Sequence, residues 1–187
     1  MNAPFVKITD AYRGAARRQP VIFVAVNIVL VILWVALIMH FSGEIADVSG
    51  QRSAKIVVGI INTVAPSANV TLENYESIEA LHNSERVVRK LAHMTEYGIL
   101  TVLIMSVLFG FRDFPRKCSY LIVVIATAVL ATIDEKNQTT VEGRYGSAFD
   151  VCIDVAASLI AVRLIFLLTQ SYRRKKRAAR ENSNPSA

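Results

Sequence analysis

Four long apolar blocks dominate the pattern of hydrophobic and polar positions along the chain. Residues 21–41 are interrupted only by Asn27 and His40, and further blocks follow at residues 91–111, 119–133 and 149–169. A helix needs about 20 residues to cross the hydrocarbon core of a bilayer, and about 17 to 25 are usual. The third block reaches this length only if flanking polar residues lie at membrane depth. The pattern predicts an all-α membrane protein with four transmembrane helices, at about residues 21–41, 91–111, 117–135 and 149–169.

The composition agrees with this fold class. The 187 residues are 53% hydrophobic, and the mean hydropathy of +0.40 is too high for an ordinary soluble domain. The first apolar block is longer than the roughly 7 to 15 residues in the core of a signal peptide, and no clear cleavage site follows it. We therefore interpret it as a retained membrane anchor.

The segment between the first two blocks, residues 42–89, is too long for a simple connection and is predicted to contain short amphipathic helices. One would end at Pro66, with Val57, Val58, Ile61 and Val64 on a single face that could rest at the membrane interface or cover the bundle. Residues 71–82 are a second, weaker candidate. Ser84 suits the N-cap of the helix that continues through the second span, with Glu85 in its first turn.

The formal net charge of +6 is concentrated beside the predicted spans. The basic residues that flank them are Lys7, Arg13, Arg17, Arg18, Arg112, Arg116, Lys117, Arg173, Arg174, Lys175, Lys176, Arg177 and Arg180. Residues 42–89 are mainly acidic instead. The positive-inside rule then predicts cytoplasmic termini, with residues 1–20 as the N-terminal segment and residues 171–187 as a basic tail, disordered from Glu181 onward. Such charges indicate orientation rather than nucleic-acid binding, and an anionic-lipid site in the tail is the weaker alternative.

A group of ionisable side chains lies where the second apolar block begins. Lys90, His93, Glu96 and Tyr97 are spaced i, i+3, i+6 and i+7, which places all four on one face of a helix. Charge at the edge of the hydrocarbon core is costly, so residues kept there usually face a polar pocket. This face is therefore a candidate functional site.

A second polar group follows the third block. Asp134, Glu135 and Gln138 are followed by Arg144, in a segment where Gly143 and Gly146 suit a turn that folds back. Asp150 and Asp154 are four residues apart and share a face of the fourth helix. The predicted topology brings both polar groups to the outer leaflet. The predicted site comprises Lys90, His93, Glu96, Tyr97, Glu135, Gln138, Arg144, Asp150 and Asp154.

Each of these residues also has a purely structural interpretation. Lys90 could extend its ammonium to the interface, and His93 with Glu96 could form a buried pair that holds helices in register. Asp134 or Glu135 could cap the third span. Asp150 and Asp154 suit the positive end of a helix dipole, and Arg144 could simply neutralise these acids. The site interpretation is favoured because acids, bases and a histidine gather on one side while the other spans stay nearly free of charge.

Taken in order, these motifs resemble the VanZ-like family of bacterial membrane proteins. The resemblance rests on Arg89-Lys90-x-x-His93-x-x-Glu96-Tyr97-x-x-Leu100, Asp134-Glu135-x-x-Gln138, Gly143-Arg144 and Asp150-x-x-x-Asp154, and on a loop with Phe41-Ser42, Ser49 and Ser53. It covers roughly residues 34–168. Asn137 stands where many members have His, and Glu142 stands where many have Pro. The resemblance implies a VanZ-like domain at residues 21–170, in the bacterial cytoplasmic membrane, with an envelope role linked to the glycopeptide teicoplanin.

The residues favour action on a membrane lipid or lipid-linked cell-wall molecule. In an enzyme, His93 would be the general base, oriented by Glu96 or Asp154, while Lys90 and Arg144 would hold a phosphate or pyrophosphate headgroup. Glu135 with Asp150 could bind a divalent cation such as Mg²⁺ or supply an acid. The same pocket suits a non-enzymatic protein that binds or shields an envelope lipid. A small transporter is less well supported, because no inverted repeat is visible, and a structural or assembly role stays open.

Overall fold

The computed structural model describes residues 4–68, 70–75, 79–111 and 115–183. In chain order the elements are α1 (Pro4–Arg18), α2 (Pro20–Ser42), α3 (Ala46–Val64), the 3-10 helix η1 (Pro66–Ala68), α4 (Leu72–Tyr75), α5 (Glu79–Gly110), α6 (Arg116–Gln138) and α7 (Ala148–Ser183). No strand occurs within these ranges. Helices α2, α5, α6 and α7 are each long and apolar enough to cross a membrane. The predicted all-α membrane protein with four transmembrane helices is therefore confirmed.

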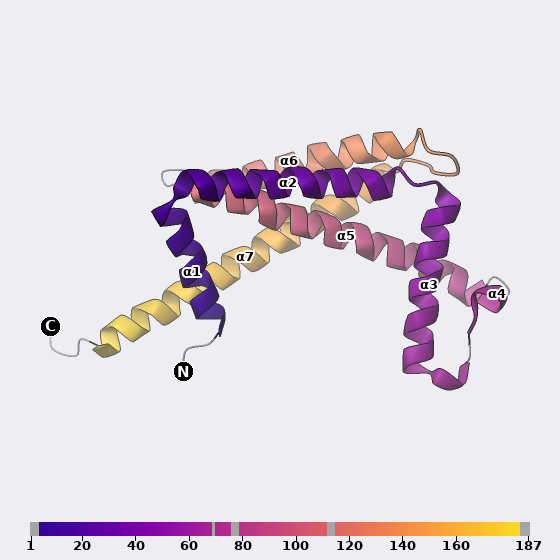
Figure 1. The fold of residues 1–187 in the computed structure, drawn as a ribbon, viewed down its shortest axis with the longest axis horizontal. Coiled ribbons are helices and arrows are strands. Elements are labelled where there is room, and N and C mark those ends of the chain that lie inside the picture. The colour runs from indigo at the N-terminus through magenta and orange to yellow at the C-terminus, as the bar shows by residue number, and fades with distance from the viewer. Residues whose placement is uncertain (1–3, 69, 76–78, 112–114, 184–187) are drawn as a thin grey trace.

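The four long helices form a bundle in which α2, α5 and α6 run alongside one another and α7 crosses them obliquely (Figure 1). Helices α1 and α3 lie at opposite ends of this bundle, and each runs across the direction of the spans. Both chain termini lie towards the end that carries α1. The bundle thus has two distinct ends, one with α1 and one with α3.

Helix α2 is apolar on nearly every side, as expected of a helix that meets lipid. It begins with Pro20, whose fixed φ suits the first helical turn. Its large side chains Ile32 and Leu33 are exposed on the bundle surface, whereas Ile38 is buried. The polar Asn27 is also buried, and its amide donates a hydrogen bond to the Phe23 carbonyl at 2.8 Å. One side of α2 therefore meets the bundle and the rest is left for the bilayer.

One cluster of the bundle core brings α2, α5 and α6 together. Ile38, Tyr97, Leu100 and Ala131 are buried against one another, with Val151 of α7 packed at their edge. The alanine on α6 lets neighbouring helices approach closely, as small residues do in membrane bundles. Trp34 adds a polar link, since its indole N–H donates to the backbone carbonyl of Glu96 at 2.9 Å. These contacts fix the position of α5 at the level where its polar face begins.

Residues 42–89 contain the predicted amphipathic helix. Helix α3 buries Ala54 and Val57, with Val58 and Ile61 packed beside them, against Val70 of the returning chain. Asn62 holds this return, because its amide donates to the Val70 carbonyl at 2.8 Å and its carbonyl accepts from the Val70 N–H at 3.0 Å. Val64 belongs to the predicted apolar face and is the last residue of α3, where it is 79% exposed. The chain leaves the helix there, so no neighbour covers it.

Three details of the predicted boundaries are corrected. Helix α5 begins at Glu79, so Ser84 lies inside the helix and is not its N-cap. The strong helix formers Glu79 and Ala80 extend the helix upstream. The candidate helix at residues 71–82 is divided between α4 and the start of α5, and residues 76–78 lie outside the described part of the chain. The tail was predicted to be disordered from Glu181, but α7 continues to Ser183, and residues 184–187 are not described.

Helix α1 was not predicted, and it is attached to the basic end of α7. Asp10 accepts hydrogen bonds from the Tyr172 hydroxyl and from the Lys176 ammonium, the latter at 3.1 Å. The Tyr172 hydrogen bond, supported by that of Lys176, holds the pKa of the Asp10 carboxyl below its usual range. The Arg13 guanidinium lies 4.3 Å from the centre of the Tyr172 ring, a cation–π distance. The N-terminal segment is therefore an ordered part of the fold.

Candidate functional site

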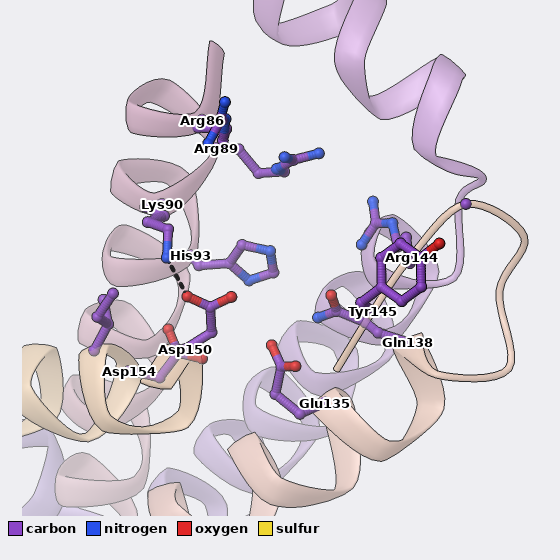
Figure 2. Close-up of a pocket in the computed structure, with 12 residues that line it drawn as sticks. Arg86, Arg89, Lys90, His93, Glu135, Gln138, Arg144, Tyr145, Asp150 and Asp154 are labelled. Atoms are coloured by element: carbon purple, nitrogen blue, oxygen red, sulfur yellow. Dashed lines mark hydrogen bonds and ion pairs between the residues drawn. The ribbon is translucent and has the colours of Figure 1, made fainter. Parts of the chain in front are cut away.

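Helices α5, α6 and α7 and the turn at residues 139–147 surround a cavity of about 340 Å³ at the end of the bundle that carries α3. Figure 2 shows side chains from all four segments pointing into the same space. The lining residues are Arg86, Arg89, Lys90, His93, Glu135, Gln138, Gly143, Arg144, Tyr145, Asp150, Ile153 and Asp154. The cavity is therefore lined almost entirely by polar and ionisable groups.

Lys90 and Asp150 form an ion pair across the cavity, between α5 and α7 (Figure 2). The Lys90 ammonium also lies 5.1 Å from the centre of the Phe149 ring. The two charged side chains are 41% and 35% exposed, so water screens part of their attraction. The charge of Lys90 is thus already compensated within the protein.

His93 projects from the same face of α5, one turn further into the bundle. Its Nδ1 lies 3.6 Å from Oε2 of Glu96, and both side chains are about one-fifth exposed. At this distance the two groups form no hydrogen bond, and they attract each other as an ion pair only when the imidazole is protonated. Within the described chain, Nδ1 is buried and has no hydrogen-bond partner. His93 therefore faces the cavity with a nitrogen still available for a hydrogen bond.

The last turns of α6 supply the acidic wall. Glu135 accepts a hydrogen bond from the Ser147 N–H at 2.7 Å, and the Ser147 hydroxyl accepts one from the Phe149 N–H at 3.2 Å. Ser147 thus acts as the N-cap of α7, and Glu135 fixes it in place. Asp134 is only 1% exposed and lies behind the cavity wall, where one carboxylate oxygen accepts a hydrogen bond from Gln138 at 3.2 Å. Neither carboxylate is a helix cap of α6, because both lie within the helix.

The turn between α6 and α7 depends on two glycines. Gly143 has φ +75°, a left-handed conformation that favours glycine. A Cβ on Gly146 would lie 2.8 Å from the Glu135 carbonyl oxygen, so the close approach of the turn to α6 requires the missing side chain. The turn carries Arg144 back over the cavity, and its Nη2 reaches the Phe41 carbonyl at 3.5 Å.

Arg144 is the cation most removed from water in this turn. Burial lowers the pKa of its guanidinium, and the positive charge of Arg89 lowers it further, while Asp134 acts in the opposite direction. Its Nε atom is buried without a hydrogen-bond partner in the described part of the chain. The guanidinium of Arg144 thus lies near other charged side chains, but not all of its N–H groups have a hydrogen-bond acceptor.

A comparison with protein-family models decides the family of this chain. The model described as VanZ/LLP1 matches residues 27–169, which is more than half of the chain. The chain belongs to the VanZ/LLP1 family. No curated protein and no solved structure matches it. All the residues that line the cavity lie within the VanZ/LLP1 match, whereas α1 and the basic end of α7 lie outside it.

The predicted site residues of this VanZ/LLP1 protein do not all reach the cavity. Those that line it are Lys90, His93, Glu135, Gln138, Arg144, Asp150 and Asp154. Glu96 lies beside His93 but is not in the lining, and Tyr97 is fully buried in the core below. Packing of α2 against this face of α5 covers both positions, which the spacing along one helix could not reveal.

Arg86, Arg89 and Tyr145 also line the cavity and were not predicted as site residues. For the two arginines a signal was present. Positions 86, 89 and 93 are spaced i, i+3 and i+7, so they share one helix face. Tyr145 carried no comparable signal, because a turn has no periodicity from which its direction could be inferred.

A divalent cation at Glu135 and Asp150 remains a prediction. Across the described ranges, no three His, Cys, Asp or Glu side chains are grouped as ligands for one metal ion. The carboxylates of Glu135 and Asp150 have protein partners instead, namely the Ser147 N–H and the Lys90 ammonium.

Proposed function

We propose that this VanZ-family membrane protein acts on a lipid or lipid-linked cell-wall molecule at the outer leaflet of the bacterial cytoplasmic membrane. The observation that carries the proposal is the cavity itself, which joins cations, carboxylates and one histidine at a single end of a four-span bundle. Ionisable groups are costly at membrane depth and are usually kept there for a function. A headgroup could enter this cavity while its acyl or prenyl chain stays in the bilayer.

The distribution of basic residues supports the proposed orientation. The end of the bundle opposite the cavity carries Arg13, Arg17 and Arg18 of α1 and the basic run at residues 173–177 of α7. Short segments rich in Lys and Arg stay in the cytoplasm during insertion. In this orientation both termini are cytoplasmic and the cavity opens to the outer face, where glycopeptides such as teicoplanin and their targets meet.

The enzyme interpretation assigns proton transfer to His93. Its ring lines the cavity, its buried Nδ1 has no hydrogen-bond partner in the described chain, and Glu96 lies close enough to stabilise an imidazolium. The role of Asp154, which lines the cavity but is only 2% exposed, would be to orient His93 or to supply a proton. These three residues are the proposed catalytic group.

A second candidate function is binding or shielding of an envelope lipid without turnover. The observation that favours it is that two other predicted catalytic groups already have structural partners, Asp150 in the ion pair with Lys90 and Glu135 at the N-cap of α7. A cavity built from such paired groups can hold a headgroup without changing it.

The test compares cells that lack the protein after complementation with wild type, His93→Ala or His40→Ala. His40 is exposed on α2, does not line the cavity and is the matched control. We expect lipid analysis to find an accumulated species, and teicoplanin sensitivity to change, in the deletion and in the His93→Ala cells only. Membrane abundance is measured in parallel. If the His93→Ala protein restores the wild-type lipid composition and teicoplanin sensitivity, His93 is not a catalytic base. If this variant loses both membrane abundance and function, His93 has a structural role.

A further inference from the structure

Three arginines gather at the exposed side of the cavity. Arg86 and Arg89 project from successive turns of α5, and Arg144 faces them from the turn between α6 and α7 (Figure 2). The Arg86 side chain is exposed and Arg89 and Arg144 are partly exposed, whereas Asp154 at the other side of the same cavity is almost completely buried. Cations therefore surround the entrance, and the carboxylates of Glu135 and Asp154 lie deeper.

None of these arginines forms a close ion pair within the described chain, although Asp134, Glu44 and Glu135 attract Arg144 at longer range. Neither Arg86 nor Arg89 forms an ion pair there, in contrast to Lys90, whose partner is Asp150. Arg144 has one long contact to a carbonyl and a buried Nε without a partner. Arg89 and Arg144 also repel each other, because the charge of one disfavours the charge of the other. Two like charges on opposite walls of an open cavity are stabilised when an anion lies between them.

The carboxylates that line the cavity form no ion pair with these arginines. Asp150 is neutralised by Lys90, and Glu135 is directed to the Ser147 N–H. Asp154 is buried on α7 at the other side of the cavity. Besides these groups and the three arginines, the ionisable side chains in the cavity lining are His93 and Tyr145. The entrance is thus left with an excess of positive charge.

We propose that Arg86, Arg89 and Arg144 form a binding site for a terminal phosphate group, the phosphomonoester or diphosphate end of a lipid-linked molecule. This inference rests on the proposed function and names the class of its ligand. A terminal phosphate offers three oxygens and a charge of about −1.5 to −2 at neutral pH. Guanidinium groups pair with such oxygens in bidentate geometry, which a compact ammonium cannot reproduce.

The same site discriminates against the bulk lipids around it. The headgroup phosphate of an ordinary membrane phospholipid is a diester, with one negative charge and two free oxygens. It would satisfy fewer guanidinium donors and leave part of the repulsion between Arg89 and Arg144 uncompensated. A protein surrounded by phosphodiesters needs a preference of this kind to select a rarer lipid that carries a terminal phosphate.

The experiment titrates the full chain, in nanodiscs of zwitterionic phosphatidylcholine without net charge, with phosphatidic acid and with phosphatidylglycerol of identical acyl chains. These probes share their tails and differ in whether the phosphate is terminal or diesterified. We expect phosphatidic acid to bind at least about tenfold more tightly to wild type. Arg89→Gln and Arg144→Gln should each reduce this affinity to about that of phosphatidylglycerol. Lys55→Gln is the matched control, because Lys55 is exposed on α3 outside the cavity lining and its replacement also removes one positive charge.

Several outcomes would overturn the inference. Equal affinity for the two lipids would remove the selectivity, and an unchanged affinity after Arg89→Gln would remove the site. If Arg89→Gln lowers the thermal stability, Arg89→Lys is used in its place. We expect the Arg89→Lys protein to fold normally but to lose part of the preference for phosphatidic acid. Displacement of the lipid by inorganic phosphate at equal concentration would identify free phosphate as the ligand, whereas a requirement for a large excess supports the lipid headgroup. The two proposals can fail separately. If the preference for phosphatidic acid is absent but lipid analysis of the His93→Ala cells still finds an accumulated species, only the phosphate site is contradicted and the proposed function stands.

Discussion

At the scale of single residues, the partner of a side chain decides its role more than its type does. Lys90 has the residue type and helix face expected of a phosphate ligand, yet its ammonium is bound to Asp150 on another helix. Arg89, its immediate neighbour, has no such partner in the described chain and faces the cavity instead. The spacing of residues along α5 indicates which side chains share a face. It cannot predict that Lys90 pairs with Asp150, a residue of another helix 60 positions later in the sequence.

The first prediction concerns this ion pair. Lys90→Gln should leave Asp150 uncompensated and lower the free energy of unfolding by about 0.5 to 1 kcal/mol, a value limited by the partial exposure of both groups. Asp150→Asn in the same chain should recover most of that loss, because it removes the unpaired charge. Denaturant unfolding in detergent for the two single variants and the double variant measures the coupling. Additive losses would show that the two side chains stabilise the fold independently.

At the scale of helices, hydroxyl groups join α5, α6 and α7 in the centre of the bundle. The Thr101 hydroxyl donates to Ser158 at 2.8 Å, and the Ser158 hydroxyl donates to Thr127 at 3.3 Å. All three side chains are fully buried. Since lipid tails are as apolar as the helix surfaces, packing and hydrogen bonds of this kind hold membrane helices together. This layer lies directly below Tyr97 and Asp154 and supports the walls of the cavity.

The second prediction uses two threonines of α6 as a matched pair. Both hydroxyls donate to the carbonyl four residues earlier, at 2.9 Å for Thr127 and 2.8 Å for Thr132, but only Thr127 is buried and accepts from Ser158. Thr127→Val should destabilise the bundle by about 0.6 to 1.7 kcal/mol, because Ser158 loses its acceptor. Thr132→Val should have almost no effect. Thermal unfolding in detergent compares the two, and equal losses would show that the interhelical hydrogen bond contributes nothing.

The sequence could predict the helices at this scale better than their ends. The apolar blocks required four spans, and the valines and isoleucine around Val57 required an amphipathic helix. The end of α6 was uncertain because Asp134 and Glu135 look like residues beyond a span, whereas burial against α5 and α7 keeps both within the helix. Helix α1 was missed for a related reason, since its attachment depends on Asp10 meeting Tyr172, a contact between the two ends of the chain.

At the scale of the whole molecule, the two ends of the bundle differ in chemistry. One end holds α1 and the basic terminus of α7, and its contacts are polar and partly exposed, as between Lys176 and Asp10. The other end holds α3 and the cavity, within the part of the chain that matches the VanZ/LLP1 family. The link between the ends is the continuous helix α7, which begins beside Glu135 and ends beyond Tyr172. The function proposed for the cavity therefore depends on which side of the membrane each end occupies.

The last prediction tests this orientation with single cysteines in a Cys118→Ser/Cys152→Ser background, since both native cysteines are free. Thr140→Cys lies in the turn beside the cavity and Ala178→Cys lies on the basic end of α7, and both positions are exposed. Neither substitution alters a charge, so the basic residues that set the topology stay unchanged. In intact cells, a membrane-impermeant maleimide should label Thr140→Cys only, and Ala178→Cys should react after the membrane is permeabilised. The reverse pattern would place the cavity in the cytoplasm, where its ligand could not be an outer-leaflet headgroup.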